Sequence, residues 1–391
     1  MLDAPPPPAG PSRAVRCRQL ALGALLALTF LAWLGQRLGY DALLAGGPLA
    51  GELALGDPQR PVRVERRALF APAAQLIVAK VPRGAGYRLG VELTVPDAAA
   101  LAGVSAPAKR RGALVAINGD YHRLGGSVCE GSPFSTFLEG SRWHALGSPY
   151  GYSCQFWLDA EGQPHVGRLD LRGQVQLPDG PLEVCLNQEL GEALLLLRTP
   201  GAWRVPQGRV ALPLELLDVR RVRVVGALRA ARKALQGPAL LAKVGFTAQR
   251  LRGLEVGAEL SLSQSGADAG KPQLVVGTGP RLLEGGQVPE ALTADPADTG
   301  WTIRVPRAAI GFDEEAVYLV ATPLDPRAGL SLADFARALA ALGCKEAVNL
   351  DGGPSPSLWA AGHGVTNSRL EPQVGTAVLV LPEAAAGVSL R

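Results

Sequence analysis

The chain carries the sequence AVNLDGGPSPS at residues 347–357, directly after a segment with helical periodicity. Large apolar residues in that segment recur at spacings of three and four, which predicts one apolar helix face. They are Leu332, Phe335, Leu339 and Leu342. Ser331 can cap the first turn, and Gly343 can take the left-handed conformation that ends a helix. We therefore predict a short amphipathic helix within residues 329–343.

A short strand follows this helix and presents polar groups at its end. Side chains along a strand alternate between its two faces, so Val348 and Leu350 face one side. Asn349 and Asp351 face the other side, and the next two residues are glycines that permit a tight turn and the close approach of a ligand. A lone Asp-Gly-Gly most often only caps a turn, so a functional interpretation needs support from the rest of the chain.

The whole block resembles the signature of the phosphodiester glycosidase family, in which a helix precedes Asn-Leu-Asp-Gly-Gly-Gly-Ser. The positions that match are Asn349, Leu350, Asp351, Gly352, Gly353 and Ser355. Pro354 replaces the third glycine. The family includes the enzyme that uncovers mannose 6-phosphate and bacterial proteins linked to exopolysaccharide.

A second motif follows the apolar run Ala113–Ile117, which is typical of a buried strand. The next residues are Asn118-Gly119-Asp120-Tyr121-His122. An Asn-Gly pair is by itself most often a plain turn. Here it is similar to the family sequence Asn-Gly-Gly-Phe-Phe, with Asp120 in place of the second glycine and His122 in place of the second aromatic residue.

Two more segments fit the same resemblance. Gly277, Gly279 and Pro280 resemble a Gly-Gly-Pro turn of the family, and the turn lacks the Lys-Ser/Thr pair of a nucleotide-binding loop. Arg307 heads a segment similar to the family's Arg-Thr-Ala-x-Gly, in which Ala308 replaces the threonine. An arginine suits a phosphate because its planar fork donates two parallel hydrogen bonds.

The resemblance implies an enzyme that hydrolyses a sugar-1-phosphodiester, and it assigns candidate roles. The catalytic candidates are Asp351, Asn118, Arg307 and Asp120. The substrate-binding candidates are Asn349, Gly352, Gly353, Ser355, Gly279 and His122. Asp351 is expected to act as acid/base or nucleophile, and either Asp120 or His122 as the second acid/base group. A calcium ion held by Asp351 and Asn349, with Asp120, is the alternative, in which Asp351 is a ligand.

The high Gly and Pro content fits a loop-rich β or α/β protein, and the resemblance implies an α/β (α+β) fold, with a single mixed-sheet domain expected at residues 61–385. The net charge is only +4, so we expect no nucleic-acid partner. A second interpretation stays open: a glycan-binding or assembly protein of the envelope that does not cut its ligand. Ala308, Pro354, Asp120 and the lack of an arginine before the last strand favour it.

The N-terminus predicts export. Residues 1–18 are Pro- and Arg-rich and are expected to be a disordered cytoplasmic tail, and residues 19–36 form an apolar run that is either a signal anchor or a cleaved signal peptide. Residues 37–60 are expected to be a tether to an extracytoplasmic domain, periplasmic or secreted if the signal is cleaved. Such a compartment allows disulfides, and Cys129 with Cys154 is the pair we expect first.

Overall fold

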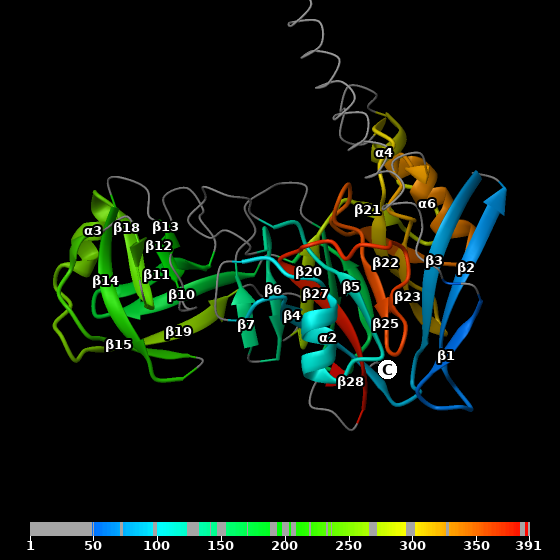
Figure 1. Ribbon diagram of the computed structural model, residues 1–391. Helices are drawn as coiled ribbons and strands as arrows, with labels where there is room; N and C mark the ends of the chain where they lie inside the picture. The colour runs from blue at the N-terminus through cyan, green and yellow to red at the C-terminus, as the bar shows by residue number, and fades with distance from the viewer. Residues whose placement is uncertain are drawn as a thin grey trace, which may run out of the picture.

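Figure 1 shows the computed structural model of the protein. The residues that the structure describes are 49, 51–70, 73–96, 100–122, 133–140, 142–146, 154–169, 171–187, 194–197, 203–204, 209–218, 220–231, 234–235, 237–265, 272–294, 302–325, 328–383 and 388–389. The predicted tail and anchor lie outside these ranges. No helix within them is both long enough and apolar enough to cross a membrane.

Most of the described chain forms strands, and three sheets make up the part that carries the motifs. Within the described residues, seven strands form the first sheet, six the second and five the third. In spatial order the seven-stranded sheet is β1 (Leu53–Leu55), β2 (Val62–Phe70), β3 (Ala73–Pro82), β23 (Ala316–Ala321), β22 (Ala308–Phe312), β24 (Glu346–Asn349) and β21 (Arg281–Leu283). The six-stranded sheet is β26 (Gly364–Val365), β25 (Leu358–Ala360), β5 (Val115–Asn118), β27 (Thr376–Pro382), β4 (Tyr87–Leu93) and β28 (Val388–Ser389). The five-stranded sheet is β7 (Arg142–Ala145), β6 (Phe137–Glu139), β20 (Leu274–Thr278), β8 (Cys154–Leu158) and β9 (Pro164–Gly167).

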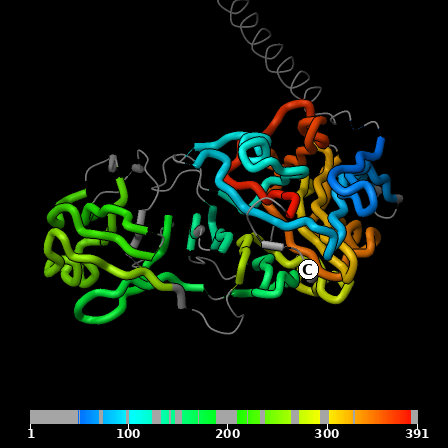
Figure 2. The backbone as a smooth tube through the Cα atoms, turned by 90° about the horizontal axis from the view of Figure 1, so that it is seen from below, coloured from blue at the N-terminus to red at the C-terminus, as the bar shows by residue number. Residues whose placement is uncertain are grey.

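An eight-stranded sheet lies to one side of these three, as both Figure 1 and Figure 2 show. Its order in the described residues is β15 (Arg221–Val224), β19 (Glu259–Ser265), β10 (Arg172–Leu177), β11 (Gly180–Leu186), β12 (Leu194–Leu197), β18 (Ala239–Lys243), β14 (Arg209–Leu216) and β16 (Arg229–Ala230). β14 also pairs with β15, so this sheet closes on itself around its own apolar cluster. A small ribbon of β13 (Trp203–Arg204) and β17 (Ala234–Leu235) accompanies it.

The prediction of one mixed sheet in an α/β fold needs correction. Among the strand pairings of the described residues, β11 with β12 is the single parallel one, and all pairings in the three sheets around the motifs are antiparallel. The continuous apolar runs come from burial on both faces, which usually marks parallel sheets. In β23, Val317 and Leu319 join the main core while Tyr318 and Val320 join a second cluster on the other face.

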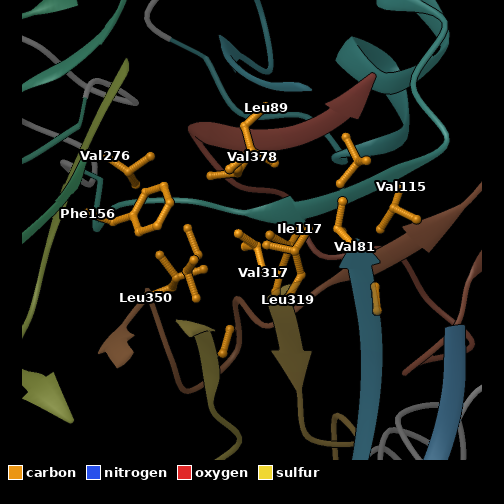
Figure 3. Close-up of a cluster of buried hydrophobic side chains, with 14 of the residues drawn as sticks. Val81, Leu89, Val115, Ile117, Phe156, Val276, Val317, Leu319, Leu350 and Val378 are labelled. Atoms are coloured by element: carbon orange, nitrogen blue, oxygen red, sulfur yellow. The ribbon is translucent and has the colours of Figure 1, made fainter. Parts of the chain in front are cut away.

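The main core lies between the seven-, six- and five-stranded sheets. Figure 3 shows side chains from all three meeting there, among them Val81, Ile117 and Phe156. Packing from both sides leaves these side chains fully buried. Truncating a buried phenylalanine to alanine typically costs about 3–5 kcal/mol, so this core fixes the relative positions of the three sheets.

Short helices cover the outer faces. They are α2 (Ser105–Arg111), α3 (Phe246–Leu251), α4 (Ala291–Ala294) and α6 (Leu332–Ala341). The helix predicted before the signature is α6: Ser331 Oγ accepts a hydrogen bond from the Asp334 N–H at 3.1 Å, and Gly343 has φ +97°. Its apolar face, with Phe335 fully buried, packs on the seven-stranded sheet. The predicted strand that follows is β24.

One other expectation changes. β1 lies inside the predicted tether, where Leu53 pairs with Val64, so the folded region begins at or before Leu53. The predicted disulfide between Cys129 and Cys154 stays a prediction, because Cys129 lies outside the described residues; Cys154 is buried.

Candidate active site

The motifs meet where strands of three sheets end. β5 ends at Asn118, β24 at Asn349 and β20 at Thr278, one residue before Gly279. Arg307 directly precedes β22. These strands belong to the six-, seven- and five-stranded sheets, whose shared core holds their ends together. Polar residues stand at these strand ends, where they are buried and make hydrogen bonds to the neighbouring loops.

Asn118 fixes the loop that carries the signature. Its Nδ2 donates to the Asp351 carbonyl at 2.8 Å, and its Oδ1 accepts from the Ser357 N–H at 3.0 Å. The Asp351 N–H in turn donates to the Gly119 carbonyl at 3.1 Å. Asn118 is fully buried, and both of its amide atoms are used by the backbone. It therefore positions the backbone of Asp351.

Asp351 and His122 lie side by side. His122 Nδ1 is 3.3 Å from Asp351 Oδ2, and the two side chains are 7% and 14% exposed. The backbone of His122, in the loop after β5, forms an isolated antiparallel bridge with Pro133. Asp351 is thus the more accessible of the two candidate carboxylates, because the Asp120 residue is only 2% exposed.

Asp120 is a buried carboxyl with one oxygen in use. Oδ2 accepts from the Ser135 N–H at 2.7 Å, whereas Oδ1 is buried and has no hydrogen-bond partner. Burial raises the pKa of Asp120 well above its ordinary value; the Ser135 hydrogen bond opposes this, and the Asp351 charge adds to the rise. The raised pKa favours the protonated form of Asp120, which suits a group that acts as an acid.

The Asn349 side chain contacts both Tyr121 and the turn that contains Gly279. Its Nδ2 lies 2.8 Å from the Tyr121 hydroxyl oxygen, 3.1 Å from the Gly279 carbonyl oxygen and 2.6 Å from the Leu350 carbonyl oxygen. The Tyr121 hydroxyl donates to Gly279 O at 3.2 Å. The backbone of Asn349 also bonds to this turn, since its carbonyl accepts from the Gly279 N–H at 3.2 Å. Asn349 is fully buried, so it too supports the site rather than facing solvent.

Arg307 is a buried cation held by neutral groups. Its Nε donates to the Leu330 carbonyl at 2.9 Å and its Nη2 to the Ile303 carbonyl at 2.7 Å, and the residue is 5% exposed. No ion pair between Arg307 and a carboxylate exists within the described part of the chain. Burial lowers the pKa of this guanidinium. A guanidinium nevertheless stays protonated in proteins, so among the described residues this charge has no carboxylate partner.

The glycines of the signature keep space beside Arg307. A Cβ at position 352 would sit 3.1 Å from the Pro306 carbonyl oxygen and 3.8 Å from Arg307 Nη1. Gly353 has φ +66°, a conformation that side chains rarely adopt, and its N–H donates to Pro306 O at 2.9 Å. Ser355 is buried, and its N–H donates to the Gly352 carbonyl at 3.3 Å. Ser355 thus stabilises the signature loop.

Sequence reasoning missed two supporting residues. Thr322 Oγ1 accepts from the Arg307 N–H at 2.9 Å, and the Thr322 carbonyl accepts from Asn367 Nδ2 at 3.1 Å. Asn367 Nδ2 also donates to Pro356 O at 2.9 Å, so these residues connect Arg307 to the signature loop. Thr322 directly follows the apolar run of β23, the same pattern that identified Asn118 and Asn349.

The donor set for calcium is small. The described residues contain no group of three or more His, Cys, Asp or Glu side chains placed to hold a metal ion. Asp351, Asp120 and Asn349 offer two carboxylates and one amide oxygen; Asp120 Oδ1 and Asn349 Oδ1 are buried and have no hydrogen-bond partner. Calcium takes six to eight oxygens. These residues therefore do not by themselves fit a calcium site, and we derive no chemical step through the ion.

The family expected from the motifs is confirmed for the C-terminal part of the chain: residues 222–381 match the phosphodiester glycosidase family. The match contains Gly279, Arg307, Asn349 and Asp351, and it begins after the Asn118 motif. No curated protein matches the chain.

Two solved structures share the fold over a longer stretch. A hypothetical protein from Synechocystis superposes with a TM-score of 0.64 at 22% identity, covering 82% of this chain and 61% of that protein. This chain thus spans less than two thirds of that protein. A Burkholderia pseudomallei protein superposes with a TM-score of 0.63 at 21% identity, covering 79% of this chain and 74% of that one. The catalytic domain of zebrafish N-acetylglucosamine-1-phosphodiester alpha-N-acetylglucosaminidase gives a TM-score of 0.41 at 13% identity, with 84% and 81% covered.

Proposed function

We propose that this chain hydrolyses a glycosidic phosphodiester, releasing a sugar from a phosphate-linked partner. The observation that carries the proposal is that Arg307, next to the signature loop, is buried and has no carboxylate partner among the described residues. A buried cation is costly unless an anion or a set of hydrogen bonds compensates it. Two neutral carbonyl oxygens hold its Nε and Nη2, while Nη1 lies on the side of Gly352. A phosphodiester placed there would supply the missing negative charge.

The proposed bond cleavage uses Asp351, the more exposed of the two candidate carboxylates. Attack at the anomeric carbon forms a new carbon–oxygen bond, and the bond from that carbon to the phosphate oxygen breaks. The leaving phosphate takes the bonding electrons, and Arg307 stabilises its charge from a fixed position. Asp351 either removes a proton from the attacking water or attacks the carbon itself, and His122 at 3.3 Å can share the proton. Inverted product would indicate the first route and retained product the second.

The cellular setting is part of the proposal. The basic and apolar segments at the N-terminus lead us to place the domain outside the cytoplasm, anchored to the membrane or released by cleavage. A phosphate-linked glycan of the bacterial envelope, such as an exopolysaccharide precursor, is the proposed substrate. Assays with and without a chelator test whether the hydrolytic activity depends on calcium.

A non-catalytic glycan-binding protein is the second candidate, and one observation favours it. Glu371 stands near the place where the family has an arginine before the last strand. Its carboxylate accepts from the Ser105 N–H at 2.6 Å and from Ser105 Oγ at 2.7 Å. Glu371 therefore caps α2, and it contributes no positive charge to the site.

Turnover of a panel of sugar-1-phosphodiesters by the full chain separates the two candidates. Asp351→Asn and Arg307→Lys are each expected to lower kcat/KM at least about 100-fold, a size seen when a catalytic or charge-stabilising group is lost. Arg304→Lys is the matched control, because Arg304 is exposed and pairs with Asp334 at 2.9 Å. Binding of the panel without turnover would exclude the enzyme and favour the binding protein.

A further inference from the structure

We infer that the Tyr121 hydroxyl is a positioning residue of this site, acting through Asn349 and the Gly279 turn. The inference rests on the proposed function and deepens it. Tyr121 follows β5 of the six-stranded sheet, Asn349 ends β24 of the seven-stranded sheet, and Gly279 follows β20 of the five-stranded sheet. The hydroxyl is thus the point where the three sheets that build the site are joined by side-chain hydrogen bonds.

The contacts form a closed triangle. The Tyr121 hydroxyl donates to Gly279 O at 3.2 Å and accepts from Asn349 Nδ2 at 2.8 Å. Asn349 Nδ2 lies 3.1 Å from the same Gly279 oxygen. An amide nitrogen has two hydrogens, and Leu350 O at 2.6 Å competes for them. Without the hydroxyl, Asn349 Nδ2 would keep only its two carbonyl partners and would lose its hydrogen bond to Tyr121.

The position of Asp351 depends on this triangle. Asp351 is two residues after Asn349, and its backbone is held on the other side by Asn118 and Gly119. A shift of the end of β24 at Asn349 would therefore move the Asp351 carboxylate relative to Arg307. Displacements of about 1 Å at an active site can lower rates by about 100-fold.

The charges around Tyr121 argue for a positioning role and against proton transfer. Burial raises the pKa of Tyr121 well above its ordinary value, and the charge of Asp351 raises it further, while Arg307 opposes the rise. The phenol therefore keeps its proton at neutral pH and acts as a fixed donor to Gly279 O. The influence of both charges also means that the hydroxyl lies in the field of the two groups proposed to act on the substrate.

A double-mutant cycle in the full chain tests the inference, with a sugar-1-phosphodiester that the wild type turns over. Tyr121→Phe keeps the ring and is expected to lower kcat about tenfold while KM changes less than about twofold. Asn349→Ala is expected to cost at least as much, and the double variant no more than Asn349→Ala alone, because the two groups act as a unit. Tyr318→Phe is the matched control: its hydroxyl donates to Asp313 at 2.7 Å, away from the site, and kcat should not change.

Each result decides the question. An unchanged kcat in Tyr121→Phe, or losses that add in the double variant, overturns the inference while the proposed function stands. A wild type that turns over no member of the panel refutes the proposed function, and the inference with it. A fall in kcat that is matched by Tyr318→Phe would show a general loss of stability and would also overturn the positioning role.

Discussion

The imidazole of His122 lies against the carboxylate of Asp351, with Nδ1 3.3 Å from Oδ2. The two residues come from different sheets, since His122 follows β5 and Asp351 follows β24. Their approach depends on Asn118, whose amide holds the Asp351 carbonyl at 2.8 Å. The contact places a group able to carry a proton next to the carboxylate that we propose meets the substrate.

Replacing this imidazole should slow the reaction. We expect His122→Gln to lower kcat by about 100-fold, because a positioned proton carrier typically contributes a factor of 100 or more, and added imidazole should restore part of the rate. Steady-state kinetics with and without imidazole measure both effects. His165→Gln is the control, because His165 also contacts an aspartate, Asp159, at 2.8 Å but on the surface. Equal losses in the two variants would contradict a role in the reaction.

Asp120 should make the protein less stable as pH rises. Burial raises the pKa of its carboxyl in the folded state, so between its ordinary value of 3.8 and the raised value the folded state binds more protons than the unfolded state. The stabilisation is complete below the ordinary value and is lost as pH rises through the folded value. Asp120→Asn cannot ionise but keeps an oxygen for the Ser135 N–H.

We therefore expect Asp120→Asn to flatten the decline in the free energy of unfolding as the pH rises above 3.8, by at most about 1.4 kcal/mol per pH unit. Urea denaturation of the full chain at several pH values measures this slope. Asp179→Asn should leave it unchanged, because the Arg250 hydrogen bond lowers the pKa of Asp179 and its titration falls at lower pH. A wild-type slope in Asp120→Asn would contradict the assignment.

A methyl group at position 352 should weaken substrate binding, because it would occupy space beside Arg307. A Cβ there would meet Pro306 O at 3.1 Å and lie 3.8 Å from Arg307 Nη1. We expect Gly352→Ala to raise KM by about tenfold, roughly 1.4 kcal/mol of binding, with a modest change in stability. Gly253→Ala, at a position with open space, is the control. A KM like that of the wild type would show that substrate does not enter beside Arg307.

Glu139 should be essential for folding rather than for the reaction. It accepts from Arg111 at 2.9 Å and 3.0 Å and from the Val91 N–H at 3.1 Å, and lies 3.7 Å from the fully buried Arg88. Glu139→Gln removes a buried negative charge, so we expect a loss of roughly 3–5 kcal/mol of unfolding free energy in urea titrations.

The exposed pair of Glu183 with Arg172, at 3.4 Å, supplies the comparison. Glu183→Gln should cost less than about 1 kcal/mol, because solvent screens the charges. Similar small losses in both variants would show that the buried cluster around Arg88 does not hold the sheets together.

Local chemistry made several parts of this protein predictable. The spacing of apolar residues and the cap at Ser331 specify α6, and the glycine at 343 ends it. The same reasoning placed Asn118 and Asn349 at strand ends, because an apolar run followed by a polar group and a glycine turn is typical of the end of a buried strand. The α/β class was wrong in part, since burial on both faces of antiparallel strands produces the same continuous runs as a parallel sheet.

The sequence by itself determined which residues would end strands and which glycines would turn, because hydrophobic period and backbone freedom are properties of neighbours along the chain. Only the tertiary structure decided that Asn118 supports Asp351, that His122 touches it and that Arg307 has neutral partners. These relationships join residues up to 233 positions apart. They depend on how three sheets share one core, and no local pattern encodes that packing.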